Sequence, residues 1–163
     1  MRFKPDSRRI AKKHLRYGVE IRWDGGTGGF VEAYRHRFRL DTPEEWGGLA
    51  EGPCPDELLA ASIGGCLLTT LLHFARRMDV KPRDVEIEVS LNIVLQGAEG
   101  YRIRGVEVSF IVEADEEDLE LLKRCAEWAV RYCHITRSLE GAIPLNVRLE
   151  VRGVSNFFPG NPN

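Results

Sequence analysis

Hydrophobic and polar residues alternate along several segments of the chain, and this period of two predicts β-strands. The clearest runs cover residues 85–93 and 102–112, with a turn at 97–100 between them. They predict a long antiparallel hairpin with one buried face. Shorter or later runs predict four further strands, at 19–23, 30–34, 36–40 and 145–151.

Two other segments carry helical signals. The first begins at Pro55, a favoured first helical position, has Asp56 and Glu57 in its first turn, and runs to about Met78. The second is expected to be capped by Asp115 and to run to about 132. The order β-β-β-α-β-β-α-β then predicts an α+β fold with antiparallel sheets and two helices.

The first helix is long and apolar. No Asp, Glu, Lys or Arg occurs between Leu58 and Ala75, which just reaches the length of a membrane span. The segment nevertheless contains Ser, Gly, Thr and His, and it lacks Trp or Tyr anchors at its ends. We therefore interpret it as a buried central helix and expect no membrane association.

The 163 residues suit one domain, which we place at 18–152 between a basic N-terminal arm (1–17) and a C-terminal tail (153–163). The formal net charge is -2, so no whole-protein field attracts nucleic acid. The arm is read as a solvated segment rather than a nucleic-acid site. The start of the chain lacks the apolar region of a secretory signal, which favours the cytoplasm.

Four cysteines are too few for a disulfide scaffold, and none forms a C-x-x-C pair. Cys66 lies mid-helix, where apolar surroundings are expected to raise its pKa. Two glycines precede it, at a cost of about 1–2 kcal/mol relative to alanines, so we expect a close neighbour there. Cys133 lies at the end of the second helix, while Cys125 is expected in the core and Cys54 at a helix entrance.

A zinc site could only be assembled from Cys66, His73, Cys133 and His134. Cys66 and His73 are seven residues apart on one helix, so about 10 Å separates them along its axis. This distance is too long for both to bind one ion. We therefore expect neither a metal nor another cofactor.

Three motifs stand out in the chain: Gly48 followed by Gly52-Pro53-Cys54-Pro55-Asp56-Glu57-Leu58-Leu59-Ala60-Ala61, then Gly65-Cys66, and Cys133 with Thr136-Arg137-Ser138-Leu139. On these motifs the chain resembles, over about 18–152, the OsmC/Ohr family of osmotically inducible and organic hydroperoxide resistance proteins. The resemblance implies an intertwined homodimer that acts as a thiol-dependent peroxidase on organic hydroperoxides. Cys66 would match the peroxidatic thiol and Cys133 the resolving thiol, with a dithiol as reductant.

Members of that family activate the thiolate with an arginine from the N-terminal strands and a glutamate at the start of the central helix. Here Asp56, with Glu57 beside it, stands ten residues before Cys66, and the arginine position falls near Gly28. Arg37 is then the favoured activating residue, ahead of its neighbours Arg35 and Arg39 and of Arg137.

Asp56 and Cys66 are about 15 Å apart along a straight helix, so a carboxylate that assists Cys66 would have to come from elsewhere, such as a partner chain. The lack of the family's arginine at Gly28 favours an alternative function. The chain would then be a non-catalytic OsmC-fold stress protein or small-molecule-binding protein with structural cysteines.

Overall fold

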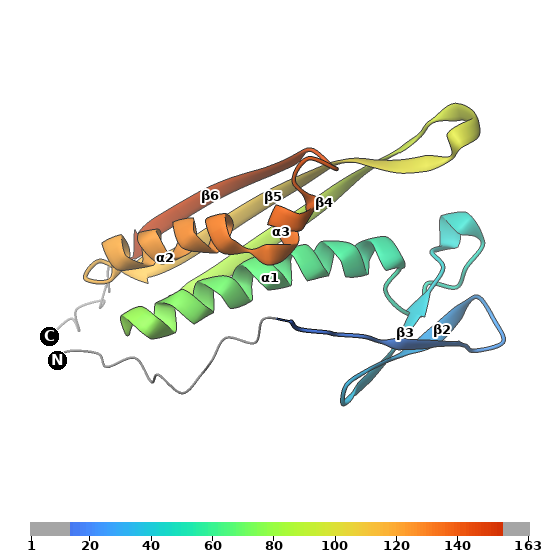
Figure 1. The fold of residues 1–163 in the computed structure, drawn as a ribbon, viewed down its shortest axis with the longest axis horizontal. Coiled ribbons are helices and arrows are strands. Elements are labelled where there is room, and N and C mark those ends of the chain that lie inside the picture. Colours follow the sequence, from blue (N-terminus) through green and yellow to red (C-terminus); the bar gives the residue numbers. More distant parts are fainter. Residues whose placement is uncertain (1–13, 155–163) are drawn as a thin grey trace, which may run out of the picture. The chain divides into compact units, whose positions relative to one another are not determined.

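The computed structural model describes residues 14–154, which belong to two compact units divided between Cys54 and Pro55. The first unit holds β1 (Glu20–Trp23), β2 (Gly28–Ala33), β3 (His36–Asp41) and the 3-10 helix η1 (Glu44–Trp46). Its strands form one antiparallel sheet in chain order (Figure 1). Most of the predicted arm and tail, at 1–13 and 155–163, lies outside the described residues.

The second unit carries the helices. Its elements are α1 (Pro55–Met78), β4 (Asp84–Leu95), η2 (Gly97–Glu99), β5 (Tyr101–Asp115), α2 (Leu119–Tyr132), α3 (His134–Leu139) and β6 (Leu145–Val154). The sheet has the order β4-β5-β6, and α1 and α2 cover one of its faces (Figure 1). This arrangement confirms the α+β class.

The strand directions agree with the sequence only in part. β4 and β5 form the predicted antiparallel hairpin, in which Ile87 pairs with Phe110. The prediction of antiparallel sheets is wrong for β6, which runs parallel to β5 and places Leu149 beside Phe110. The reason is the connection, because α2 and α3 supply the long crossover that parallel neighbours require.

The helix boundaries also differ at one point. α1 begins at Pro55 and ends at Met78, as predicted. The prediction that Asp115 caps the second helix is wrong, because Asp115 is the last residue of β5 and Asp118 occupies the N-cap position of α2. The short helix α3 was not predicted at all.

One face of α1 forms the centre of the hydrophobic core. Ile63, Leu67 and Leu71 are fully buried there, and Phe110 of β5 is buried in the same cluster. On the opposite face, Ala61, Gly65 and Leu72 are exposed within residues 14–154. The expected buried central helix is therefore buried on one face only in the part of the chain that the structure describes. The length and apolar composition of α1 would suffice to cross a membrane, but a core helix has the same features.

The two adjacent glycines of α1 have different surroundings. A Cβ at Gly64 would lie 3.2 Å from Val89 and 3.4 Å from Ile87, so α1 approaches β4 closely at this point. A Cβ at Gly65 would meet no atom within 4 Å. The predicted close neighbour is confirmed for Gly64 but not for Gly65.

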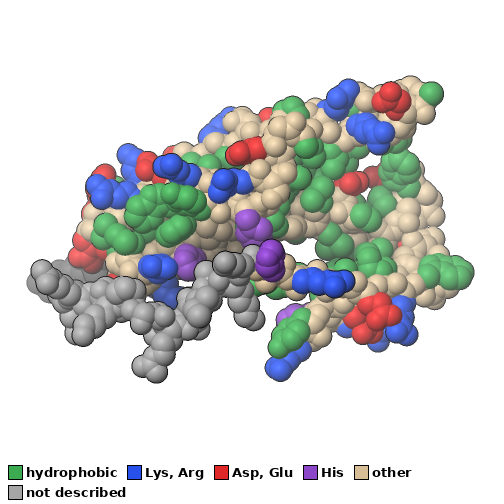
Figure 2. Space-filling view, in the orientation of Figure 1, with side chains coloured by type: hydrophobic (Ala, Val, Ile, Leu, Met, Phe, Trp, Pro, Cys, Tyr) green, Lys and Arg blue, Asp and Glu red, His purple; other side chains and the backbone are tan. Residues whose placement is uncertain are grey.

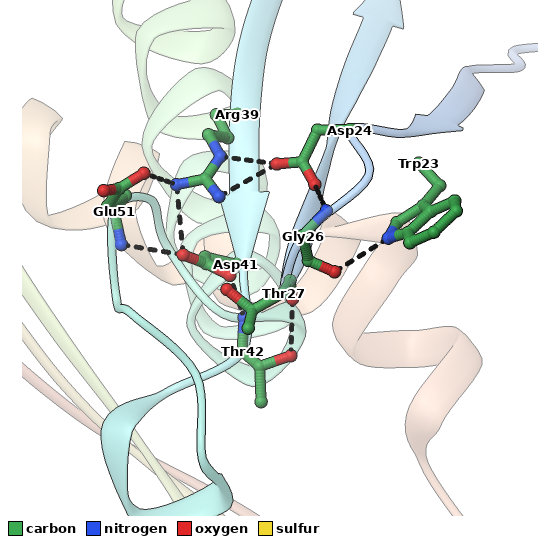
Figure 3. Close-up of polar contacts among 8 residues, drawn as sticks. All are labelled: Trp23, Asp24, Gly26, Thr27, Arg39, Asp41, Thr42 and Glu51. Carbon is green, nitrogen blue, oxygen red and sulfur yellow. Dashed lines mark hydrogen bonds and ion pairs between the residues drawn. The ribbon is translucent and has the colours of Figure 1, made fainter.

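The first unit is held together by charge as well as by packing (Figure 3). The Arg39 guanidinium contacts Asp24 at 2.9 Å and Asp41 at 3.1 Å, and it also pairs with Glu51. The Asp41 carboxylate in addition accepts the backbone N–H groups of Thr42 and Glu51. Arg39 thus joins the turn after β1, the end of β3 and the loop that follows.

These contacts keep the two aspartates ionised. The backbone N–H of Gly26 and the Arg39 side chain hold the pKa of Asp24 below its ordinary value. Burial alone would raise the pKa of Asp41, but hydrogen bonds to its carboxylate and the charge of Arg39 outweigh that effect and lower it. The network is therefore stable only while Arg39 is present to balance the carboxylates.

Candidate active site

The candidate site lies in the second unit, where the middle of α1 meets the junction of α2 and α3. Cys133 is the single residue between these two helices, and its extended backbone (φ -60°, ψ 112°) interrupts the helical path. Its N–H donates to the carbonyl of Ala129 at 2.9 Å, and its own carbonyl accepts the N–H of Arg137 at 3.1 Å. Cys133 thereby ends one helix and begins the next, with its side chain fully buried.

This junction brings Cys133 to Cys66. Cys133 and Cys66 belong to the same buried cluster, and the Cys133 side chain is close enough to raise the pKa of the Cys66 thiol, although the two residues are far apart in the sequence. No disulfide joins any of the four cysteines, all of which lie among the described residues. Cys66 retains 7% of its exposure, whereas Cys133 has none. The two cysteines singled out by the family resemblance are thus neighbours, and the more accessible one is Cys66.

A histidine completes the cluster. His134 is the first residue of α3, and its Nδ1 lies 3.6 Å from the Cys66 Sγ. Its side chain is exposed, so the imidazole connects a nearly buried thiol with solvent. Sequence reasoning placed His134 beside Cys133 but did not place it beside Cys66, because that distance depends on the turn at Cys133.

The surroundings of Cys66 favour the neutral thiol. Burial raises the pKa of Cys66, and the contact with Cys133 raises it further. The backbone N–H of Ile135 and the hydroxyl of Thr70 act in the opposite direction, yet the net pKa stays above the ordinary value. This confirms the expected direction. A reaction that needs the thiolate therefore needs a group that removes the proton.

Aromatic rings hold α1 against α2 beside this site. Phe74 of α1 packs on Trp128 and Tyr132 of α2, with ring centroids 5.3 Å and 5.9 Å away. Hydrophobic side chains gather over these two helices on the face shown in Figure 2. Cys66 lies in α1, and Cys133 directly follows α2. The packing of the two helices therefore fixes the distance between the two cysteines.

The other predicted site residues lie elsewhere. Asp56 and Glu57 occupy the first turn of α1, where both are exposed, and Cys66 follows about 15 Å along the same helix. Arg37 belongs to the first unit, where its guanidinium lies 4.2 Å from the centroid of the Phe30 ring and its Nε lies 4.0 Å from Glu32. The roles of these three residues stay predictions.

The structure also explains why position 28 cannot supply an arginine. A Cβ at Gly28 would lie 2.3 Å from the carbonyl oxygen of Leu40, so the close pairing of β2 with β3 admits no side chain there. The guanidinium of Arg39, on β3, already forms ion pairs with three carboxylates. Arg37 carries a more exposed guanidinium, with 61% of its side chain accessible.

Metal-binding residues do not converge in the described part of the chain. Residues 14–154 contain no group of three or more His, Cys, Asp or Glu side chains placed to hold an ion. His73, a member of the zinc set considered from the sequence, packs edge-on against Phe74, with ring centroids 5.4 Å apart.

An apolar groove of about 370 Å³ runs between α1 and β4. It is lined by small residues of the helix, including Ala61, Gly64 and Gly65, and by β-branched residues of the strand, including Val85 and Val89. The groove follows the face of α1 that the chain itself leaves exposed, and it could receive either another protein surface or an apolar ligand.

Comparisons with known proteins agree on one fold. The family model described as OsmC-like protein matches residues 48–148. The uncharacterized protein YmaD of Bacillus subtilis (strain 168) is 24% identical over 139 residues, which are 82% of this chain and 93% of that protein.

Solved structures extend the likeness in three dimensions. An OsmC-like protein from Mycoplasma pneumoniae aligns with a TM-score of 0.71 at 16% identity, over 84% of this chain and 97% of that one. An organic hydroperoxide resistance protein from Elizabethkingia anophelis aligns with a TM-score of 0.65 at 19% identity, over 88% of this chain and 99% of that one. At these identities the structures show a shared fold.

Proposed function

Because this chain belongs to the OsmC family, we propose that it is a thiol-dependent peroxidase that reduces organic hydroperoxides with Cys66 and Cys133. The observation that carries the proposal is the contact between these two thiols in the folded chain. The fold likeness to a protein named for organic hydroperoxide resistance supports the substrate class. A pair of reduced thiols also suits the cytoplasm, which is the location that we propose.

The exposures of the two thiols suggest the order of the steps. The Cys66 thiolate attacks the terminal oxygen of the hydroperoxide, so that an S–O bond forms, the O–O bond breaks and the alkoxide leaves to be protonated to an alcohol. The buried Cys133 thiol then displaces water from the Cys66 sulfenic acid and forms a disulfide. A dithiol reductant restores both thiols by exchange.

A positive charge near Cys66 would favour its thiolate, and we propose that Arg37 supplies it. Its guanidinium is more exposed than that of Arg39 and is not enclosed by carboxylates. Asp56 or Glu57 would then hold the guanidinium by paired hydrogen bonds, which gives the charge a fixed orientation.

Oxidation by the substrate provides the test. One equivalent of cumene hydroperoxide should reduce the count of titratable thiols from four to two, because one disulfide forms between Cys66 and Cys133. Peptide mass mapping should find this pair joined and should find Cys54 and Cys125 still as thiols. If all four thiols persist although Cys66 can be alkylated, the peroxidase proposal fails.

The same measurement weighs the alternative of a non-catalytic binding protein. The raised pKa of Cys66 and the apolar groove beside α1 favour that alternative. A binding protein would keep its thiols under peroxide, whereas a peroxidase would form the disulfide within its turnover time.

We also propose that the chain forms a homodimer through the exposed face of α1. A glycine within a helix costs about 1 kcal/mol relative to alanine, and no neighbour among residues 14–154 lies close enough to Gly65 to require it. A second copy packed on the groove between α1 and β4 would require such a small residue and would cover the exposed Ala61 and Leu72.

Gly65→Glu is therefore expected to convert the dimer into a monomer without unfolding it. Among residues 14–154 an added Cβ at this position meets no atom within 4 Å, the position is exposed, and glutamate is a better helix former than glycine. Light scattering after size exclusion should give twice the chain mass for the native protein and once for the variant. Ala142→Glu, at an exposed position between α3 and β6, is the matched control and should stay dimeric. A dimeric Gly65→Glu protein would exclude this face as the interface.

A further inference from the structure

We propose that His134 accepts the proton of the Cys66 thiol and later donates it to the leaving alkoxide. Only the donation to the alkoxide rests on the proposed peroxidase function. The imidazole Nδ1 lies 3.6 Å from the Cys66 Sγ, which is within the range of a sulfur hydrogen bond. His134 is exposed, whereas only 7% of the surface of Cys66 is accessible. A proton can therefore pass from the thiol to the ring and from the ring to solvent.

The chemistry of the site requires such a group. Cys66 is held as a neutral thiol by burial and by its contact with Cys133, and a neutral thiol is a poor nucleophile. An adjacent imidazole that takes the proton is a general way to activate cysteine. His134 meets the geometric condition for that role, because its Nδ1 lies 3.6 Å from the Cys66 Sγ, within reach of the thiol proton in the tautomer that leaves Nδ1 unprotonated.

The proton can then serve both steps of the first half-reaction. The Cys66 thiol transfers its proton to Nδ1, and the sulfur attacks the terminal oxygen of the hydroperoxide. As the O–O bond breaks, the alkoxide receives the proton from the imidazolium and leaves as an alcohol. The sum is one thiol and one hydroperoxide converted to one sulfenic acid and one alcohol, with His134 returned to its neutral form.

The backbone fixes His134 in this position. The extended conformation of Cys133 starts α3 at His134, and the N–H of the next residue, Ile135, points to the Cys66 sulfur. The start of α3 is therefore held against α1 at the thiol. The other ionisable side chains on the surrounding helices, α1, α2 and α3, and at their junction include Cys133, His73, Arg131 and Arg137.

Alkylation tests the role without any peroxide. Cys66 in His134→Gln should react with iodoacetamide at least about tenfold more slowly at pH 7, because general base catalysis is lost. The pH profile of the native rate should also differ from that of the variant, because only the native protein carries a base beside the thiol. The reaction is followed on the Cys66 peptide by mass spectrometry, so that the other cysteines do not interfere.

Two further variants separate proton transfer from structure. His134→Phe keeps a ring without nitrogen and should behave as His134→Gln does, while circular dichroism checks that both remain folded. His73→Gln removes the exposed histidine two turns along α1 and should match the native rate and pH profile. A native rate and profile in both His134 variants would overturn the proposal.

Peroxide consumption by the native protein is a separate measurement. If the native chain consumes no cumene hydroperoxide but the His134 variants alkylate slowly, then the peroxidase function fails and the role of His134 toward Cys66 stands. If the native chain consumes peroxide and the variants alkylate normally, then the function stands and the role of His134 fails.

Discussion

Replacing Cys66 with serine is expected to abolish hydroperoxide reduction, with a fall in turnover of at least about 10³-fold. A serine hydroxyl stays protonated at neutral pH and does not attack the O–O bond, so the first step has no substitute. The change removes little volume, so the core around Ile63 and Leu67 should stay packed. The measurement is the consumption of cumene hydroperoxide with dithiothreitol as the reductant.

The other cysteines show whether this loss is specific. In the absence of dithiothreitol, Cys133→Ser should consume one equivalent of hydroperoxide per chain and then stop, with a Cys66 sulfenic acid that dimedone can trap. Cys54→Ser should turn over at the native rate. If Cys66→Ser stays active while Cys133→Ser does not react at all, the two thiols have the opposite roles.

Local signals predicted both ends of the first helix. Pro55 suits the first helical turn, the acidic side chains of Asp56 and Glu57 favour its N-terminus, and the helix ends at Met78, shortly after the uncharged run. The hairpin of β4 and β5 was equally readable, because each strand alternates over many residues and a Gly-rich turn joins them. In these elements the local preference and the tertiary packing agree.

The direction of β6 and the existence of α3 were not readable in the same way. Alternation tells which face of a strand is buried, but it does not tell which neighbour the strand pairs with or in which direction. α3 has six residues, fewer than two helical turns, and it follows α2 after only Cys133. No Gly or Pro marks that break, so the turn that brings His134 to Cys66 could not be foreseen.

Alternation placed Arg35, Arg37 and Arg39 on one face of a strand. The structure keeps Arg37 and Arg39 on β3, whereas Arg35 lies in the turn between β2 and β3, so its predicted place on the strand is wrong. Their surroundings separate them, because Asp24 and Glu51 reach only Arg39, from a turn and a loop on either side of it in sequence. The sequence therefore left several arginines as candidates, Arg137 of α3 among them, while long-range contacts decide that Arg39 is structural.

Arg39→Met is expected to destabilise the first unit strongly at neutral pH, by about 10 °C in the midpoint of thermal unfolding. The substitution keeps an apolar side chain of similar length but leaves Asp24, Asp41 and Glu51 together without a cation. Arg37→Met is the matched control on the same strand and face, and its exposed guanidinium should be lost with little effect. Tryptophan fluorescence follows the transition, since Trp23 and Trp46 belong to this unit.

The pH dependence of the two proteins should have opposite signs. In the native protein the pKa values of Asp24 and Asp41 are lowered, so their contribution to stability is complete above the unfolded pKa of about 3.9 and is lost as pH falls through the folded values. Without Arg39, burial and mutual repulsion should raise the pKa of Asp41 instead. The variant should then recover stability as pH falls from about 6 to 4, while the native contribution of the two aspartates stays nearly constant over this range and is lost only at lower pH. A constant difference between the two midpoints across this range would mean that Arg39 acts by packing rather than by balancing the buried carboxylates.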